Sequence, residues 1–296
     1  MKYHELMTSI SKGEVRSAYL FSGEEDFLKE EALKKIISSQ VKPGFRSFDL
    51  DILHGDDISF QTLRSCAETL PFGSVRRVVV LRNLEGLSQS SRRKLLSWLE
   101  SPPPRTCLIL VAAKVDFKEG FYRELASKTE SVVFWRLFDH QIPKWAVKYL
   151  KEKGLAIEEE ALYVLYALVG NDLFSLTNEL EKVSTYLGQG GKIGVEGIRS
   201  VVGSHRIDSV FDLNLALGMG ELEAALKVIG NLLDWGETPN RILAMVSRHL
   251  FILKRLKAPK YRDGSLEELA RKLRIPKLYL KDYIRQVERL SGEDID

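Results

Sequence analysis

Residues 19–33 read YLFSGEEDFLKEEAL and predict a short apolar strand, a glycine turn and the start of an amphipathic helix. Many α/β proteins bind a phosphate at such a junction, because the N–H groups and the dipole at a helix N-terminus attract anions. Gly23 begins the turn, and Lys29 stands six residues later, at the position of the lysine in a P-loop. However, Leu28 replaces the second glycine of that motif, and Glu30 replaces its Ser/Thr.

These departures predict that the junction does not bind a nucleotide. Leu28 places a bulky side chain in the loop, and no hydroxyl follows Lys29 to hold Mg²⁺. The carboxylates of Glu24, Glu25 and Asp26 suit the positive end of the helix dipole, but they repel a phosphate from the same place. We therefore expect no cofactor here, and we interpret the lysine as a surface residue of an amphipathic helix.

A second stretch leads to the same expectation. Residues 75–81, VRRVVVL, form a β-branched run that is typical of a strand buried on both faces of a parallel sheet. In P-loop ATPases the corresponding strand ends in acidic residues that hold Mg²⁺. Here it ends in Arg82 and Asn83, and neither side chain can act as a carboxylate ligand.

Strand and helix patterns alternate through the first 140 residues. Strands are expected at residues 17–21, 46–53, 75–81, 106–112 and 131–138, with helices at 27–38, 58–70, 88–101 and 121–128. Five strands with intervening helices predict a three-layer α/β domain with a parallel sheet.

After about residue 140 the strand patterns disappear, and only helices are expected. They are predicted at residues 142–153, 158–169, 172–187, 195–202, 210–219, 221–234, 239–257, 266–273 and 276–290. The expected organisation is an α/β domain over residues 1–140, followed by two all-α domains over 141–205 and 206–296.

Composition favours a cytoplasmic protein. The chain has 296 residues, 44% apolar and 29% charged, and its two cysteines, Cys66 and Cys107, lie in apolar surroundings. Two such thiols suggest a reducing compartment. No apolar run reaches the roughly 20 residues of a membrane helix, and the N-terminus lacks the apolar segment of a signal peptide.

No catalytic or metal-binding pattern is present in the sequence. The five histidines are scattered, and neither GxSxG nor HExxH occurs. Residues 241–296 carry 14 Lys/Arg against 8 Asp/Glu, a charge of +6 in a chain whose total is +3. This basic region is either a solvated helical face or a surface for DNA or an acidic partner, for which the candidates are Arg248, Lys254, Arg255 and Lys257.

The loop ETLPFGSVRR at residues 68–77 places three apolar residues, Leu70, Pro71 and Phe72, between a predicted helix and a buried strand. Loops normally run over the surface. The apolar side chains therefore either pack onto the core or contact a partner. From the residues alone core packing is favoured, because large exposed apolar patches are rare.

Several blocks resemble known proteins. The block SSRRKLLSWLESPPPRTCLILVA at residues 90–112 resembles the clamp-loader subgroup of AAA+ proteins, which carry an LL-x-x-LE-x-PP-x-x-T pattern. Residues 170–188, GNDLFSLTNELEKVSTYLG, and 209–257, which begin SVFDLNLALGMGELEAAL, are similar to the bacterial DNA polymerase III delta subunits. In this family the P-loop does not bind ATP, which matches the departures described above.

The resemblance implies an AAA+-like domain, a small helical lid domain and a helical collar domain. It implies a non-catalytic subunit that binds the ring-shaped sliding clamp and opens it for loading onto primed DNA. The collar would assemble with ATP-binding subunits and delta-prime. The family's clamp-binding wedge corresponds to Leu70, Pro71 and Phe72, of which Phe72 matches the aromatic member and Leu70 is assigned as its partner.

The sequence differs from the family pattern at its end. Family members usually continue past DYIRQVERLSGEDID with another helical stretch, whereas this chain stops at Asp296. The chain is then either a shortened natural form or an incomplete gene product, and in both cases we expect a weaker collar assembly. Two other functions remain as alternatives. One is an ATP-hydrolysing motor with an unusual P-loop, and the other is an adaptor that binds DNA through the basic C-terminal helices.

Overall fold

The computed structural model describes residues 1–138, 140–170, 172–188, 191–202, 204–258, 268–269, 273 and 277–290. The chain divides into two compact units, Met1–Arg136 and Leu137–Asp296, and each is described by itself. This division lies close to the predicted boundary at residue 140, while the further boundary near residue 205 stays a prediction.

The first unit contains the predicted five-stranded parallel sheet, with the strand order β2-β3-β4-β1-β5. The strands are β1 (Ala18–Gly23), β2 (Leu50–His54), β3 (Arg77–Arg82), β4 (Thr106–Val111) and β5 (Glu130–Phe134). The three central strands are buried along almost their whole length, as their continuous apolar runs predict.

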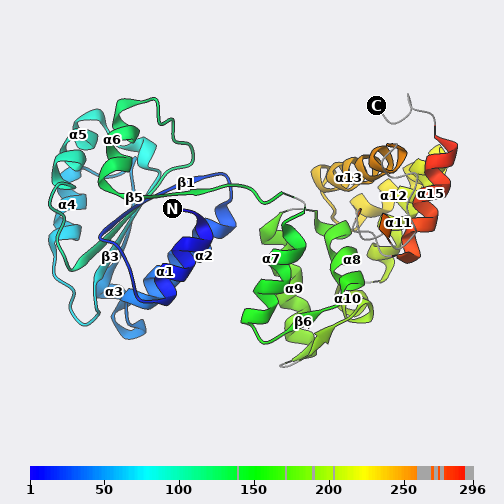
Figure 1. Cartoon of the computed structure of the whole chain (residues 1–296), viewed down its shortest axis with the longest axis horizontal. Coiled ribbons are helices and arrows are strands. Elements are labelled where there is room, and N and C mark those ends of the chain that lie inside the picture. The colour runs from blue at the N-terminus through cyan, green and yellow to red at the C-terminus, as the bar shows by residue number, and fades with distance from the viewer. Residues whose placement is uncertain are drawn as a thin grey trace. The chain divides into compact units, whose positions relative to one another are not determined.

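Helices cover both faces of this sheet (Figure 1). On one face lie α1 (Tyr3–Ser11) and α2 (Asp26–Gln40), and on the other α4 (Phe60–Glu68), α5 (Gln89–Trp98) and α6 (Gly120–Lys128). The core between the sheet and α4, α5 and α6 includes Leu20, Leu63, Leu81 and Leu110, all almost fully buried. The sequence-based prediction of three layers is confirmed.

One predicted strand is wrong in its first half. Residues 46–53 were expected to be extended, but Arg46–Asp49 form a helical turn, α3, and β2 begins only at Leu50. The turn follows the short 3-10 helix Pro43–Phe45. It places the rings of Phe45 and Phe48 where both meet the ring of Phe72. This contact with a residue more than twenty positions away is not visible in local periodicity.

The second unit is mostly helical. Its helices are α7 (Ile142–Glu152), α8 (Glu159–Val169), α9 (Leu173–Leu187), α10 (Val195–Val202), α11 (Ser204–Met219), α12 (Leu222–Asp234), α13 (Pro239–Lys257) and α15 (Lys277–Arg289). The expectation that no strand follows residue 140 is wrong, because Ala156–Ile157 and Lys192–Ile193 form a two-stranded parallel sheet. Strands of two residues are too short to show an alternating pattern. The helix expected at 266–273 lies mostly outside the described residues.

A buried hydrogen bond joins α13 and α15, and α11 packs closely against it. The Nε2–H group of His249 donates to Oε1 of Gln286 (2.7 Å), and both side chains are almost fully buried. Gly218 lies so close to Gln286 that a Cβ atom there would overlap the amide oxygen. Burial lowers the pKa of His249 to about 4, although the contact with Gln286 acts in the opposite direction.

Candidate functional site

The turn after β1 packs directly against the backbone of the neighbouring strand, β5. Gly23 has a φ of +111°, and a Cβ atom there would collide with the carbonyl group of Phe134 on β5. The backbone N–H of Glu25 donates to the same carbonyl oxygen (3.1 Å). A glycine is therefore required by backbone conformation and by this close approach, independently of any phosphate.

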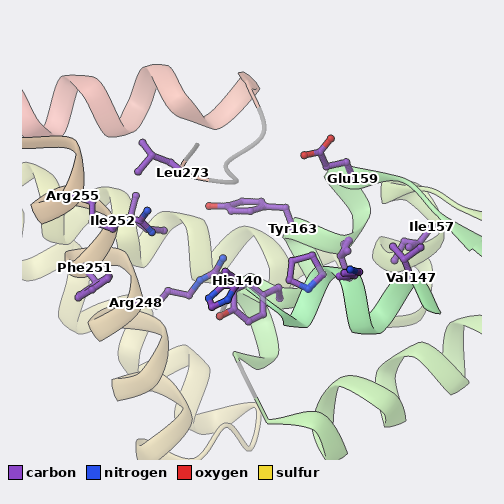
Figure 2. Close-up of a pocket in the computed structure, with 14 residues that line it drawn as sticks. His140, Val147, Ile157, Glu159, Tyr163, Arg248, Phe251, Ile252, Arg255 and Leu273 are labelled. Carbon is purple, nitrogen blue, oxygen red and sulfur yellow. The ribbon is translucent and has the colours of Figure 1, made fainter. Parts of the chain in front are cut away.

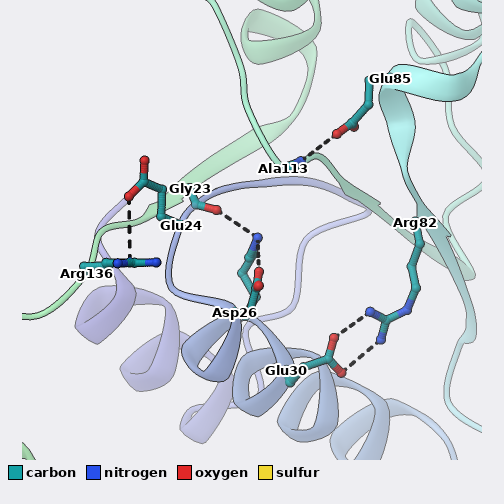
Figure 3. Close-up of polar contacts among 9 residues, drawn as sticks. Gly23, Glu24, Asp26, Glu30, Arg82, Glu85, Ala113 and Arg136 are labelled. Carbon is teal, nitrogen blue, oxygen red and sulfur yellow. Dashed lines mark hydrogen bonds and ion pairs between the residues drawn. The ribbon is translucent and has the colours of Figure 1, made fainter. Parts of the chain in front are cut away.

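Lys29 is buried, so the expectation of a surface lysine is wrong. Its side chain is only 6% exposed. The ammonium group donates to the carbonyl oxygen of Gly23 (2.8 Å) and pairs with Oδ1 of Asp26 (2.7 Å; Figure 3). Burial of a charge is costly unless it is paired and hydrogen-bonded, and here the chain itself supplies both partners. In a P-loop the lysine ammonium binds a phosphate, whereas here it is paired with Asp26 and hydrogen-bonded to Gly23.

The two residues that depart most clearly from the ATPase pattern bind each other. Arg82, at the end of β3, donates to both carboxylate oxygens of Glu30 on α2, at 2.6 and 2.9 Å (Figure 3). The hydrogen bonds to Glu30 raise the pKa of Arg82. Glu30 stands where a P-loop has the Ser/Thr that binds Mg²⁺, and Arg82 where the acidic strand end would be. A guanidinium–carboxylate pair at these two positions cannot coordinate Mg²⁺.

The apolar loop between α4 and β3 is exposed. Leu70 is 71% and Phe72 76% exposed, and Pro71 is partly buried. The core-packing interpretation favoured from the residues alone is therefore wrong. Two large apolar side chains on one loop, facing solvent, are typical of a contact surface for a partner.

The exposed loop is held from beneath by one carboxylate. Asp49 is fully buried, and it accepts hydrogen bonds from the backbone N–H groups of Phe72 (2.5 Å), Gly73 (3.0 Å) and Ser74 (2.9 Å). Burial acts to raise the pKa of the Asp49 carboxyl. The Ser74 hydroxyl and the three amides outweigh this effect, so the pKa lies below its ordinary value.

Aromatic contacts add to this support. The ring of Phe72 lies 5.4 Å from that of Phe48 and 6.0 Å from that of Phe45, measured between centroids. Gly73 leaves the space for the ring of Phe45, since a Cβ atom at residue 73 would approach that ring to 2.5 Å. Phe48 is itself 57% exposed and extends the apolar surface beyond Leu70 and Phe72.

Sequence reasoning missed Asp49 and Phe48 as parts of this site. The available signal was the spacing of Phe45 and Phe48, three residues apart, which suits one side of a helical turn better than a strand. Nothing local in the sequence connects Asp49 with the loop 70–74, because the contact spans more than twenty residues.

The four basic candidates lie on α13 in different surroundings. The guanidinium of Arg248 stacks on the ring of Tyr166, 3.7 Å from its centroid, and also lies near Tyr163. The ammonium of Lys257 donates to the carbonyl oxygen of Leu290. Lys254 and Arg255 are exposed. Arg248 and Lys257 therefore contact other parts of the chain. The role of all four residues towards DNA stays a prediction.

Metal-binding clusters and membrane-spanning helices are both absent from the described residues. No group of three or more His, Cys, Asp or Glu side chains there could hold a metal ion. Within the same residues, no helix is long and apolar enough to cross a membrane.

The fold and the turn after β1 define the class of protein. A five-stranded parallel sheet of this order, with helices on both faces and a strand–turn–helix at the position of a P-loop, is an AAA+-like unit. The residues at the P-loop lysine and Ser/Thr positions, Lys29 and Glu30, instead pair with Asp26 and Arg82. The model of the family "DNA polymerase III, delta subunit" matches residues 19–134, and the model of the C-terminal domain of the same delta subunit matches residues 207–296.

Similar proteins carry the same description. The chain is 23% identical to the DNA polymerase III subunit delta of Bacillus subtilis, covering 98% of this chain and 87% of that one. It is 26% identical to the probable DNA polymerase III subunit delta of Aquifex aeolicus, covering 94% and 82%. The solved structure of the Bacillus subtilis DNA clamp loader delta protein matches with a TM-score of 0.61 and 23% identity, covering 99% of this chain and 89% of that chain. This chain belongs to the DNA polymerase III delta subunit family.

Proposed function

We propose that this protein is a non-catalytic clamp-loader subunit that binds the sliding clamp through Leu70 and Phe72 and opens the ring for loading onto primed DNA. The observation that carries the proposal is the exposure of these two side chains, 71% and 76%, on a loop whose backbone is fixed by Asp49. Apolar anchors that enter a pocket on the partner commonly supply most of the binding energy of an interface.

Preorganisation explains why the loop is suited to this task. An interface loop that is already ordered loses less conformational entropy on binding, so more of the contact energy appears as affinity. Asp49 supplies this order through three backbone amides, and Phe45 and Phe48 restrict the ring of Phe72. Pro71 stiffens the chain between the two anchors because its ring restricts φ.

Further partners follow from membership of the family. The second unit would provide the collar that assembles with ATP-binding subunits and delta-prime, and primed DNA would lie within the complete complex. In this proposal the chain acts in the cytoplasm. The ATP-motor alternative is disfavoured by the pairing of Glu30 with Arg82 and of Lys29 with Asp26.

The test uses the purified full chain and the sliding clamp, without ATP. Binding is measured by isothermal titration calorimetry for the wild type and for Leu70→Ala with Phe72→Ala. Loss of the anchors should reduce affinity by at least about 30-fold, since truncating one hot-spot residue costs about 2 kcal/mol or more.

The matched control removes a leucine and a phenylalanine that are exposed elsewhere, Leu222→Ala with Phe117→Ala. This control variant should bind the clamp as the wild type does. Equal clamp affinity of the wild type and the 70/72 variant, with both folded by circular dichroism, would refute the assignment of the wedge.

A further inference from the structure

The helical turn α3 places a third large apolar side chain beside Leu70 and Phe72. Phe48 is 57% exposed, and its ring centroid lies 5.4 Å from that of Phe72, with the two ring planes tilted by 35°. Both rings are too exposed to fill the core of the first unit. A partner that receives the ring of Phe72 therefore meets the ring of Phe48 within the same contact.

The backbone of Phe48 is held in place by the rest of the first unit. The guanidinium of Arg77 on β3 donates to the carbonyl oxygen of Phe48 (2.5 Å) and to Oδ2 of Asp51 (2.6 Å), and Arg77 is only 9% exposed. The next residue, Asp49, is fully buried. An ordered backbone thus presents the ring to solvent, so a partner that covers it loses little conformational entropy in doing so.

Two cations lie at the edge of this apolar surface. Lys42 and Arg46 are both exposed. The backbone N–H of Lys42 donates to the hydroxyl of Ser74 (3.2 Å), which places Lys42 beside the loop that carries Phe72. Arg46 precedes Phe48 by two residues on the same helical turn. Among the residues that the structure describes, neither cation forms an ion pair.

The carboxylates of α3, of β2 and of the end of α4 are already bound within the chain. Asp49 accepts the three loop amides. Asp51 pairs with Arg77 (2.6 Å), and Glu68 pairs with Arg64 (2.8 Å). The surface around the apolar side chains is therefore positive, and carboxylates on a partner are its complement.

We propose that the contact of this chain with the sliding clamp extends from Leu70 and Phe72 over Phe48. Lys42 and Arg46 pair with carboxylates of the clamp at the rim of this contact. The inference rests on the proposed function and specifies the pocket that receives the loop. That pocket has an apolar floor that covers two aromatic rings and a leucine, and acidic side chains stand at its edge. The covered rings supply affinity, whereas the rim charges act mainly on the rate of association.

Single-stranded nucleic acid is a poorer fit for this surface. Bases stack on free aromatic faces, whereas the ring of Phe72 lies against those of Phe45 and Phe48. Leu70 offers no face for stacking, and an apolar pocket accounts for its exposure of 71%.

The first test compares two phenylalanine variants of the full chain for binding to the purified sliding clamp by surface plasmon resonance. Phe48→Ala should weaken binding at least about 5-fold, mainly through faster dissociation, because loss of an interface contact acts on the off-rate. The matched control is Phe251→Ala, which removes a phenylalanine of similar exposure, 60%, from α13 of the second unit (Figure 2). Its affinity should stay within about twofold of the wild type, as expected for an independent site.

A second measurement separates direct contact of Phe48 from mere support of Phe72. The photo-crosslinking residue p-benzoylphenylalanine replaces Phe48 in one variant and Phe251 in another. Irradiation with the clamp should give a covalent adduct for position 48 and none for position 251. Hydrogen exchange of the amides of residues 72–74 should stay unchanged in Phe48→Ala, since Asp49 holds them.

The cations are tested through association kinetics. Lys42→Gln with Arg46→Gln should lower the association rate constant about 3-fold or more at about 50 mM salt, and this difference should largely disappear at about 1 M, where the Debye length is about 3 Å. The matched control, Arg93→Gln with Lys94→Gln, removes two exposed cations of α5 and changes the net charge equally. Lys94 lies beside the first turn of α4, at the opposite end of that helix from the loop. The control should associate within about twofold of the wild type, because steering depends on the charges around the contact.

The extended contact is ruled out if Phe48→Ala binds the clamp as tightly as Phe251→Ala, or if position 48 gives no adduct. An equal loss of association rate in the two cation variants would reduce the effect to net charge and remove the acidic rim. A labelled oligothymidine that competes with the clamp and loses affinity in Phe48→Ala would identify a nucleic-acid surface instead. If the 70/72 variant loses clamp binding and Phe48→Ala does not, the proposed function stands and only this inference fails. If neither variant loses binding, both fail.

Discussion

Asparagine in place of Asp49 removes one charge and leaves the shape of the side chain nearly unchanged. The carboxylate accepts one amide at Oδ1, from Phe72, and two at Oδ2, from Gly73 and Ser74. In Asp49→Asn one of these oxygens becomes an NH₂ group, which is a donor only. Either one or two backbone N–H groups then face another donor in a buried position.

The magnitude follows from these contacts. A hydrogen bond to a charged group contributes about 1.5–3 kcal/mol, and an unsatisfied buried donor costs about 1–3 kcal/mol. Water can reach part of the loop because Phe72 is exposed, so the loss is smaller than the sum of three bonds. We expect Asp49→Asn to lower the free energy of unfolding of the first unit by about 3 kcal/mol.

Two measurements report on this loss. Urea denaturation followed by tryptophan fluorescence gives the free energy of unfolding, and Trp98 lies in the first unit. Hydrogen exchange of the amides of residues 72–74, measured by mass spectrometry, reports on the loop directly. These amides should exchange about 100-fold faster in Asp49→Asn, the factor that corresponds to about 3 kcal/mol. Asp57→Asn, at an exposed aspartate, should stay within about 0.5 kcal/mol of the wild type.

The effect should depend on pH in a defined direction. The pKa of Asp49 is lowered in the folded protein, so the carboxylate stabilises the fold above the unfolded pKa of about 3.9. This contribution is lost as the pH falls through the lower, folded pKa. The difference in unfolding free energy between the wild type and Asp49→Asn should therefore be constant from pH 7 to about 4.5 and decrease at lower pH.

The reasoning is refuted if Asp49→Asn unfolds at the same urea concentration as Asp57→Asn, and if the amides of residues 72–74 keep their protection. Either the loop would then be held by the aromatic contacts alone, or the carboxylate would be replaceable by water. A large destabilisation that persists undiminished below pH 3 would also contradict the assignment of the effect to charge.

Three further predictions concern the strand–turn–helix at the P-loop position and the core of the second unit. A double-mutant cycle with Glu30→Gln and Arg82→Gln should give a coupling of about 1 kcal/mol, since the pair is bidentate but both side chains are about a third exposed. Isothermal titration calorimetry of the isolated chain should detect no micromolar Mg·ATP binding, and such binding would revive the ATP-motor alternative. Because His249 has a pKa of about 4 in the fold and about 6.5 unfolded, stability should fall by up to about 3 kcal/mol from pH 6.5 to 4. The free energy of unfolding of His249→Gln should depend less on pH over this range. A pH dependence identical to that of the wild type would contradict the prediction.

Local patterns in the sequence were sufficient for most of the elements and for the departures from the nucleotide-binding motif. They did not predict the helical turn at 46–49 or the two-residue strands at 156–157 and 192–193. Continuous apolar runs such as residues 75–81 predicted the buried strands, because burial on both faces leaves no polar alternation. The prediction that the chain does not bind ATP followed from residue types alone. Leu28 cannot form a phosphate loop, and Arg82 cannot bind Mg²⁺, wherever the fold places them.

The sequence also placed Leu70 and Phe72 in a loop, but it could not decide whether they were buried. Their exposure depends on Asp49 and on the turn at residues 46–49, which draw the loop backbone inwards and leave the side chains in solvent. These contacts join residues more than twenty positions apart, beyond the range of any local pattern.

Tertiary structure likewise decided the surroundings of the charged residues. Lys29 follows the spacing of a surface lysine, yet it is buried against Gly23 and Asp26, and Glu30 binds Arg82 from a strand fifty residues away. Periodicity reports which face of a helix is apolar, whereas the partner of a charge depends on which elements the fold brings together. The sequence by itself thus determined most of the strands and helices and the departures from the nucleotide-binding motif. Only the packing of distant elements determined which side chains are exposed and which charges neutralise each other.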